Sequence, residues 1–168
     1  NNIYTEPEPI VIAAPQTPQQ NRDVIVQTGY YKNFSPKYGE AELRLVSVDG
    51  NNSDAEVMDV VLKKTIRRKS TFQGQTNTYN STLIETLRVD SLIIEKMKYT
   101  NKDGFVKNYE NYYIAGKGIY EKYNENLATG KITGRSKTNV PALRVQITKQ
   151  AYDDMKAIFG DDNNIIYK

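Results

Sequence analysis

The sequence contains no cysteine, no histidine and no tryptophan among its 168 residues. Without cysteine the chain has no disulfide, no thiol nucleophile and no zinc–thiolate site. Without histidine it lacks the most common general base and the most common metal ligand, which excludes catalysis by Ser-His-Asp and Cys-His groups. We therefore expect no catalytic residues, no cofactor and no bound metal, and regard the chain as non-enzymatic.

Long hydrophobic runs are also missing. Hydrophobic residues make up 38% of the chain, the mean hydropathy is −0.67, and no apolar run approaches the ~18 residues that span a bilayer. A chain of this length can still bury one core of ordinary size. Its 23 basic and 20 acidic residues nearly balance at +3, which gives only a weak preference for anionic partners.

Proline is scarce outside residues 1–22, which hold four of the six prolines. Because proline interrupts regular backbone hydrogen bonding, this segment is predicted to be an extended tether of polyproline II character. No basic segment followed by an apolar one marks a signal peptide, although one could have been removed before the numbering begins. A Pro-rich tether ahead of a small Cys-free β domain resembles the architecture of mature bacterial envelope lipoproteins, without a family motif.

The most informative stretch is residues 83–120, where two β-type runs flank a tight turn. From Leu83 to Tyr99 every second residue is mostly apolar and the others mostly polar, which is the pattern of a strand with one buried face. Residues 101–104 have the composition of a type I turn, and a tyrosine-rich strand follows. We expect a bulge or a break at residues 90–91 and a bulge at residues 116–118. A helix is the alternative for the first run.

The rest of the chain predicts shorter strands, a polar mobile loop and one helix. The loop is expected over residues 70–81, and an irregular aromatic segment over residues 30–39 follows a strand that Gly29 ends. Thr148 is the expected N-cap of a helix over 149–159, whose apolar stripe is Tyr152, Met155, Ile158 and Phe159, with Gly160 at the C′ position. The expected strands cover residues 24–26, 40–48, 55–68, 142–147 and 165–167. Residues 127–132 are expected to form a turn into a short strand that Gly134 closes.

These elements define the expected fold class. It is mainly β, an antiparallel sheet or sandwich, with one C-terminal helix, and α+β is the alternative. A helix capped by Ser53 remains the alternative to a strand over residues 55–68. The expected organisation is a tether over 1–22, a single domain over 23–160 and a tail over 161–168.

Two groups of residues are candidates for contacting a partner. The aromatic group either packs as a lid over the core or forms an exposed recognition surface, and it consists of Tyr30, Tyr31, Phe34 and Tyr38. The basic group places five cations within seven positions, at Lys63, Lys64, Arg67, Arg68 and Lys69. Such a run can bind nucleic-acid phosphates or an anionic membrane surface. We favour a third interpretation, an edge strand that its charges protect from unwanted pairing.

Two chemical alternatives depend on oxygen ligands and carboxylates. Asp49, Asn51 and Ser53 have the spacing of a calcium loop, but the pattern fails at the positions of Asp54 and Val60. A glycosidase would need two facing carboxylates, and the strand pattern explains the candidates as solvent-face residues; they are Glu85, Glu95 and Glu110.

The Pro-rich tether, the 13 tyrosines and the missing catalytic residue types together favour a non-enzymatic interaction or structural domain. We expect an extracytoplasmic protein, periplasmic or tethered at a membrane surface, that binds protein partners of an envelope assembly. The oligomeric state stays open. A carboxylate-based enzyme acting on carbohydrate and a nucleic-acid-binding module at residues 63–69 are the alternatives.

Overall fold

The computed structural model describes residues 23–49, 52–159 and 163–167, which form one seven-stranded sheet and one helix. Six strands follow one another as an antiparallel meander, and the seventh pairs in parallel with β4. The predicted class, mainly β with one C-terminal helix, is confirmed. The elements are β1 (Val24–Ser35), β2 (Gly39–Asp49), β3 (Asn52–Phe72), β4 (Gln75–Thr100), β5 (Val106–Asn126), β6 (Ile132–Ile147), α1 (Lys149–Phe159) and β7 (Asn163–Tyr167).

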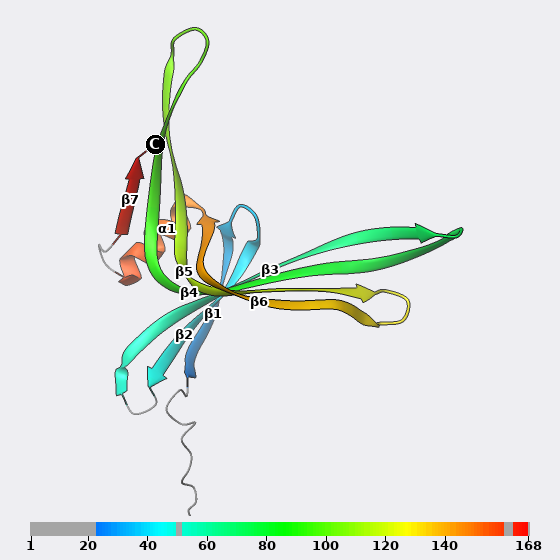
Figure 1. The fold of residues 1–168 in the computed structure, drawn as a ribbon. Helices are drawn as coiled ribbons and strands as arrows, with labels where there is room; N and C mark the ends of the chain where they lie inside the picture. The colour runs from blue at the N-terminus through cyan, green and yellow to red at the C-terminus, as the bar shows by residue number, and fades with distance from the viewer. Residues whose placement is uncertain (1–22, 50–51, 160–162, 168) are drawn as a thin grey trace, which may run out of the picture.

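The sheet is coiled, so that β1 and the end of β6 meet. Thr148, which follows β6, donates its backbone N–H to the carbonyl of Phe34 in β1 at 2.9 Å. Its hydroxyl donates to the carbonyl of Asn33 at 2.8 Å. Helix α1 leaves from this junction and packs beside the sheet (Figure 1). Its Tyr152 and Met155 side chains are buried. One residue therefore joins the two edges of the sheet and positions the helix.

Thr148 is also the N-cap that the sequence predicts. The backbone N–H of Ala151 donates to its hydroxyl oxygen at 3.2 Å, which satisfies one of the unpaired donors at a helix start. The predicted helix over 149–159 is confirmed. The predicted C′ residue, Gly160, lies outside the described residues.

The predicted apolar stripe of α1 is only half right. Tyr152 and Met155 are buried, whereas Ile158 and Phe159 are 57% and 36% exposed. The last turn of the helix lies beyond the core cluster, whose most C-terminal member is Met155. The helical period identified the correct face but could not show where the core ends.

The core lies inside the curve of the sheet, beneath α1. Burying each large apolar side chain contributes about 1.5–3 kcal/mol. The largest fully buried ones come from all parts of the sheet and the helix, and include Phe34, Leu62, Leu87, Leu92, Ile114, Ile147 and Met155.

Two bulges bend the strands at the centre of the sheet. The register between β4 and β5 shifts between Val89 and Ser91, and that between β5 and β6 shifts between Gly116 and Gly118. Both predicted bulges are thereby confirmed. At Gly116 the strands approach so closely that a Cβ atom would lie 1.9 Å from the carbonyl oxygen of Arg88. The bend therefore requires glycine at this position.

The first bulge changes which residues of β4 face the core. Leu87 and Val89 belong to the core before the bulge, and Leu92 belongs to it afterwards. The alternating apolar stripe predicted from Leu83 to Tyr99 therefore holds only as far as Val89. An extra residue in one strand inverts the inward and outward faces of everything that follows.

Two extensions leave the core (Figure 1). The arm is four-stranded and comprises residues 63–84 of β3 and β4 and residues 119–139 of β5 and β6, joined by pairs such as Tyr79 with Asn126. The ribbon is the β4–β5 hairpin over residues 97–109. The pairing of β4 with β7 stops at Lys96 and that of β5 with β6 stops at Tyr112. The ribbon is therefore two-stranded throughout the described structure.

The polar segment over residues 70–81 is not a mobile loop, contrary to the prediction. It belongs to β3 and β4, which pair continuously from Asp59 with Arg88 to Phe72 with Gln75. The turn between the strands is Gln73–Gly74, with φ values of 51° and 81°. Two successive left-handed residues form the tight hairpin turn that matches strand twist. The segment is rich in threonine, one of the residues enriched in strands.

Other boundaries also differ from the prediction. Gly29 lies inside β1, whose pairing with β2 continues to Ser35 with Gly39, so the aromatic segment is mostly strand. Pro141 likewise lies inside β6, at the irregular pairing opposite Gly116 and Gly118, where proline removes no regular ladder bond. The segment over 55–68 is a strand as predicted, since it belongs to β3.

Candidate interaction surfaces

The structure divides the four candidate aromatic residues between core and surface. Phe34 is fully buried and Tyr38 is 8% exposed, which matches the first of the two alternatives, packing over the core. The Tyr31 ring contacts Phe34 edge-on, with centroids 5.4 Å apart, and its hydroxyl donates to Asp154 of α1 at 2.6 Å. Burial, and then the bond to Asp154, raise the pKa of Tyr31 to about 12. Tyr30 is 70% exposed and open to a partner.

Tyr38 and Glu85 form a buried polar pair. The Tyr38 hydroxyl donates to Oε2 of Glu85, a β4 residue whose exposure is 7%. Burial, followed by the bond to Glu85, raises the pKa of Tyr38 well above its usual value. The pair joins the β1–β2 connection to the middle of the sheet, and its carboxylate does not face a second carboxylate.

Glu95 is the centre of another closed cluster. Nη2 of Arg144 donates to its carboxylate at 2.9 Å, and the Tyr113 hydroxyl donates to it at 3.2 Å. The Arg144 guanidinium also stacks 3.8 Å above the centroid of the Tyr113 ring. With Glu95 only 5% exposed, these contacts compensate a buried charge.

Glu110 lies at the base of the ribbon. The Tyr112 hydroxyl donates to its Oε1 at 2.8 Å, and Nζ of Lys96 lies 3.9 Å from its Oε2. Burial, and then the bond to Glu110, raise the pKa of Tyr112 to about 12. The three candidate carboxylates are thus held in three separate clusters. Among them the described structure contains no facing pair of the kind that a glycosidase uses.

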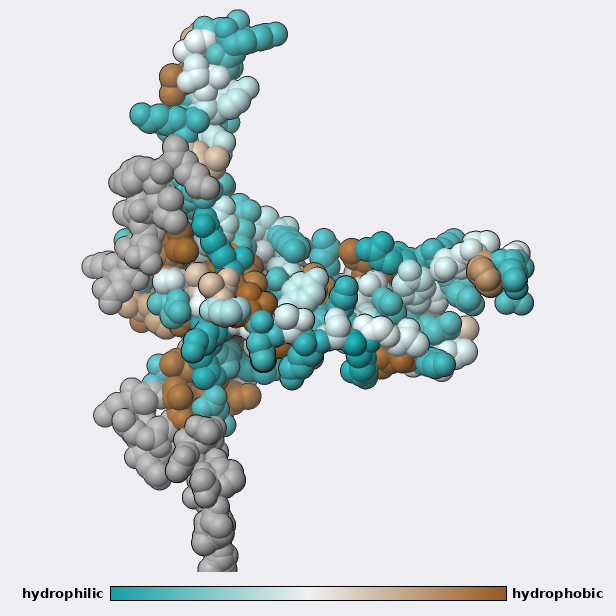
Figure 2. Space-filling model, in the orientation of Figure 1, coloured by the Kyte–Doolittle hydropathy of each residue, from teal (hydrophilic) through white to brown (hydrophobic). Residues whose placement is uncertain are grey.

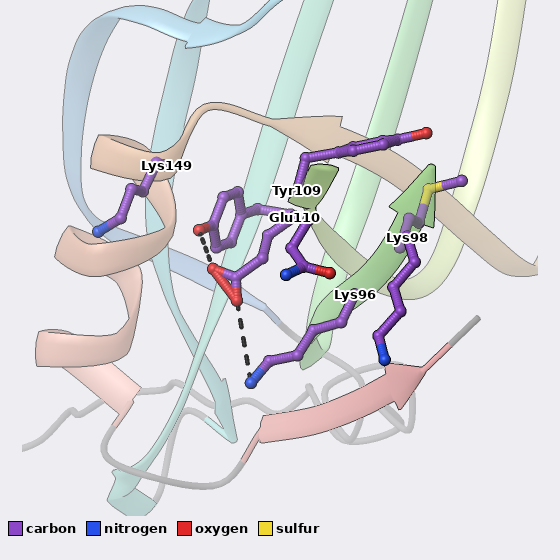
Figure 3. Close-up of a pocket in the computed structure, with 8 residues that line it drawn as sticks. Lys96, Lys98, Tyr109, Glu110 and Lys149 are labelled. Carbon is purple, nitrogen blue, oxygen red and sulfur yellow. Dashed lines mark hydrogen bonds and ion pairs between the residues drawn. The ribbon is translucent and has the colours of Figure 1, made fainter. Parts of the chain in front are cut away.

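A hollow of about 890 Å³ lies where the ribbon meets α1. Figure 3 shows Lys96 and Lys98 reaching it from β4 and Lys149 from α1, with Tyr109 and Glu110 on the facing strand. Nζ of Lys149 pairs with Asp153 one turn along α1 at 2.9 Å. The hollow therefore combines an aromatic wall with lysine side chains.

The five basic candidates lie together on the arm. The residues Lys63, Lys64, Arg67, Arg68 and Lys69 follow the part of β3 that pairs with β4 alone, since the pairing with β2 ends at Leu62. They therefore lie along an outer edge of the described sheet, as the sequence predicts. Their side chains alternate between the two faces of the arm.

A second set of cations was missed by the sequence argument. The structure places these residues on the β5–β6 half of the arm, and they are Lys122, Lys131, Arg135 and Lys137. More than fifty residues separate the two sets along the chain, and only the pairing of β4 with β5 brings them together. Recognising residues 63–84 as a long hairpin would have revealed the arm.

Exposed apolar side chains occur at the far ends of the molecule as well as at Tyr30 and at Ile158 of α1. The ribbon carries Phe105 and Val106, which are 72% and 58% exposed, and the arm ends in Phe72 at 71% and Leu127 at 41%. At the start of β1, residues 24–26 are about half exposed: Val24 46%, Ile25 52% and Val26 56%. Figure 2 shows brown hydrophobic atoms on the projecting parts of the molecule as well as on its body.

No protein-family model, curated protein or solved structure matches this chain. In the part of the chain that the structure describes, α1 has neither the length nor the apolarity to cross a membrane. The same residues contain no cluster of three or more potential metal ligands. The surfaces above are therefore the basis for a functional proposal.

Proposed function

We propose that this protein is a non-enzymatic structural subunit of a multi-chain assembly, in which the arm and the ribbon contact neighbouring subunits. The observation that carries this proposal is the position of the exposed apolar side chains. The most exposed of them include Phe72 at the tip of the arm and Phe105 at the tip of the ribbon. Both lie far beyond the core, where they add nothing to the folding of this chain.

The ribbon gives the physical reason for proposing contacts with neighbouring subunits. A two-stranded hairpin is at best marginally stable in water on its own, and the ribbon over residues 97–109 has no third strand in the described structure. Its large apolar side chains are nevertheless mostly exposed, including Tyr99 at 57% and Phe105 at 72%. Covering one such side chain in a partner contributes about 1.5–3 kcal/mol. Aromatic residues are also the typical anchors of protein interfaces.

The arrangement of carboxylates supports this proposal over a carbohydrate enzyme. Each of Glu85, Glu95 and Glu110 is held by its own tyrosine or cation, which stabilises the fold. The envelope location inferred from the Pro-rich tether is part of the proposal. Determining the N-terminus of the precursor tests that location directly, because a signal peptide identifies an exported protein.

The test of the proposed function shortens the ribbon without disturbing its register. Replacing residues 100–106 by Asn-Gly joins Tyr99 to Lys107, which already face each other, through a favoured two-residue turn. We expect this variant to unfold at nearly the parent temperature but to be lost from the native complex. Native electrophoresis of extracts from the cells that produce the protein measures the complex.

A matched control changes the ribbon turn but keeps its apolar residues. The variant Lys102→Ala with Asp103→Ala retains Phe105 and Val106 and should enter the complex as the parent does. A parent chain that migrates as a monomer in cell extracts, or a shortened variant that stays in the complex, would contradict the proposal.

A further inference from the structure

Strand β3 carries its charges in two opposite blocks. Its first half, residues 52–62, holds three acidic residues and no basic one, and its second half, residues 63–72, holds five basic residues and no acidic one. The acidic block continues into the end of β2. Residues 45–62 contain four acidic residues and no basic one, and we call this stretch the acidic end. The two ends of a single strand therefore differ in sign.

The arm extends the positive block. Over residues 63–84 and 119–139 it holds nine lysines and arginines and two glutamates. Within the described chain none of these nine cations forms an ion pair; Arg135 lies over the Tyr123 ring at 5.5 Å. The arm therefore presents a strongly basic surface on a molecule whose net charge is only +3.

The acidic end and the tip of the arm cannot neutralise each other within one molecule. A 21-residue strand spans about 70 Å when straight, at ~3.3 Å per residue. Figure 1 shows β3 running from the acidic end through the centre of the sheet to the tip of the arm. Salt screens exposed charges beyond about 8 Å at physiological ionic strength. At the acidic end Asp59 pairs with Arg88 at 2.8 Å, whereas Glu56 is exposed. The arm cations and Glu56 are thus available to a second molecule.

We infer that the arm of one copy docks against the acidic end of a second copy, head to tail. This inference rests on the proposed role as a structural subunit and names the partner as the chain itself. Charge complementarity carries it, because one chain presents both signs on separate ends. Such a contact joins two different surfaces, so it propagates into a ring or a filament rather than closing as a twofold dimer.

The tip of the arm and the acidic end also both carry exposed apolar side chains. Phe72 at the tip of the arm is 71% exposed. At the acidic end, exposed Val24 pairs with Ser47, which in turn pairs with Glu56. Docking places apolar side chains together inside a rim of opposite charges, the usual anatomy of a protein interface.

The test reverses each charge block separately in the full chain. The arm variant carries Lys63→Glu, Lys64→Glu, Arg67→Glu, Arg68→Glu and Lys69→Glu, which leaves the arm with four cations and seven glutamates. The acidic-end variant carries Asp49→Lys, Asp54→Lys and Glu56→Lys. Reversal is used rather than neutralisation because charge of either sign keeps the outer edge of β3 from adding strands. Circular dichroism and thermal unfolding establish that both variants are folded.

Sedimentation velocity then measures association at about 50 mM and about 500 mM salt, where screening differs strongly. We expect the parent to associate with increasing concentration at low salt and to dissociate at high salt. Each variant alone should stay monomeric because its two ends have the same sign. An equimolar mixture of the two variants should associate again, because the arm of each then meets an end of opposite charge.

A parent chain that stays monomeric at low salt overturns the inference, and so does an arm variant that associates as the parent does. Parent monomers that instead bind a duplex oligonucleotide, and lose it on arm reversal, assign the arm to nucleic acid and also overturn it. These results leave the proposed function standing if the chain still migrates in a large complex from cells. Loss of that complex is the separate result that refutes the proposed function.

Discussion

The buried pair of Tyr38 and Glu85 allows a sharp prediction of stability. Replacing Tyr38 by Phe removes one oxygen atom and leaves the ring in the core. The carboxylate of Glu85, 7% exposed, then loses a hydrogen-bond donor in a place that water reaches poorly. Hydrogen bonds to charged groups contribute about 1.5–3 kcal/mol, so we expect a loss of about 2 kcal/mol. For a chain of this size, that lowers the unfolding temperature by about 4–8 °C.

Urea unfolding followed by circular dichroism measures this loss. Tyr30→Phe is the matched control, because Tyr30 is 70% exposed and should change stability by less than about 0.5 kcal/mol. The double variant Tyr38→Phe with Glu85→Leu should recover part of the loss, since it removes the unpaired carboxylate as well. If Tyr38→Phe were as stable as the Tyr30 control, the buried bond would contribute nothing and the reasoning would be wrong.

Two further predictions concern the bend and alkaline pH. Gly116→Ala should cost about 3 kcal/mol or more, because its Cβ would meet a backbone carbonyl at 1.9 Å; Gly29→Ala, with open space around it, should change urea stability little. Tyr31 and Tyr112 have pKa values raised to about 12, whereas unfolded tyrosine ionises near 10. Stability should therefore fall as pH rises from 10 towards 12, and less steeply in Tyr31→Phe; an equal fall would contradict this assignment.

Local patterns in the sequence predicted those parts of the fold that pack against the core. The helix over 149–159 and its cap at Thr148 were correct because an amphipathic period and a hydroxyl at the helix start are local signals. The central hairpin and its bulges were also predicted correctly. Apolar and polar residues alternate from Leu83 to Val89, and the glycine at position 116 indicated a bulge. In each case the signal depends on burial against residues of the same domain.

The same reasoning failed where strands leave the core. Residues 70–81 show no alternation of apolar and polar side chains because neither face of the arm is buried over this segment. Their polarity was therefore interpreted as a loop. The turn signal at Gln73–Gly74 was weak, since its flanking residues are polar as well. The second set of arm cations was missed for a related reason, because it joins the first only through the long pairing of β4 with β5.

The composition of β3 changes where the strand leaves the core and enters the arm. The core-facing row of β3 includes Val60 and Leu62, which are fully buried. It continues along the same face with Lys64, Ile66 and Arg68. On the same face, apolar residues thus give way to cations just where the core ends. Selection for folding alone would not lengthen strands past the core, because ordering each extra residue costs about 1–2 kcal/mol of conformational entropy. We propose that a neighbouring subunit covers the extension, and that the charge of the arm selects the surface which that neighbour presents.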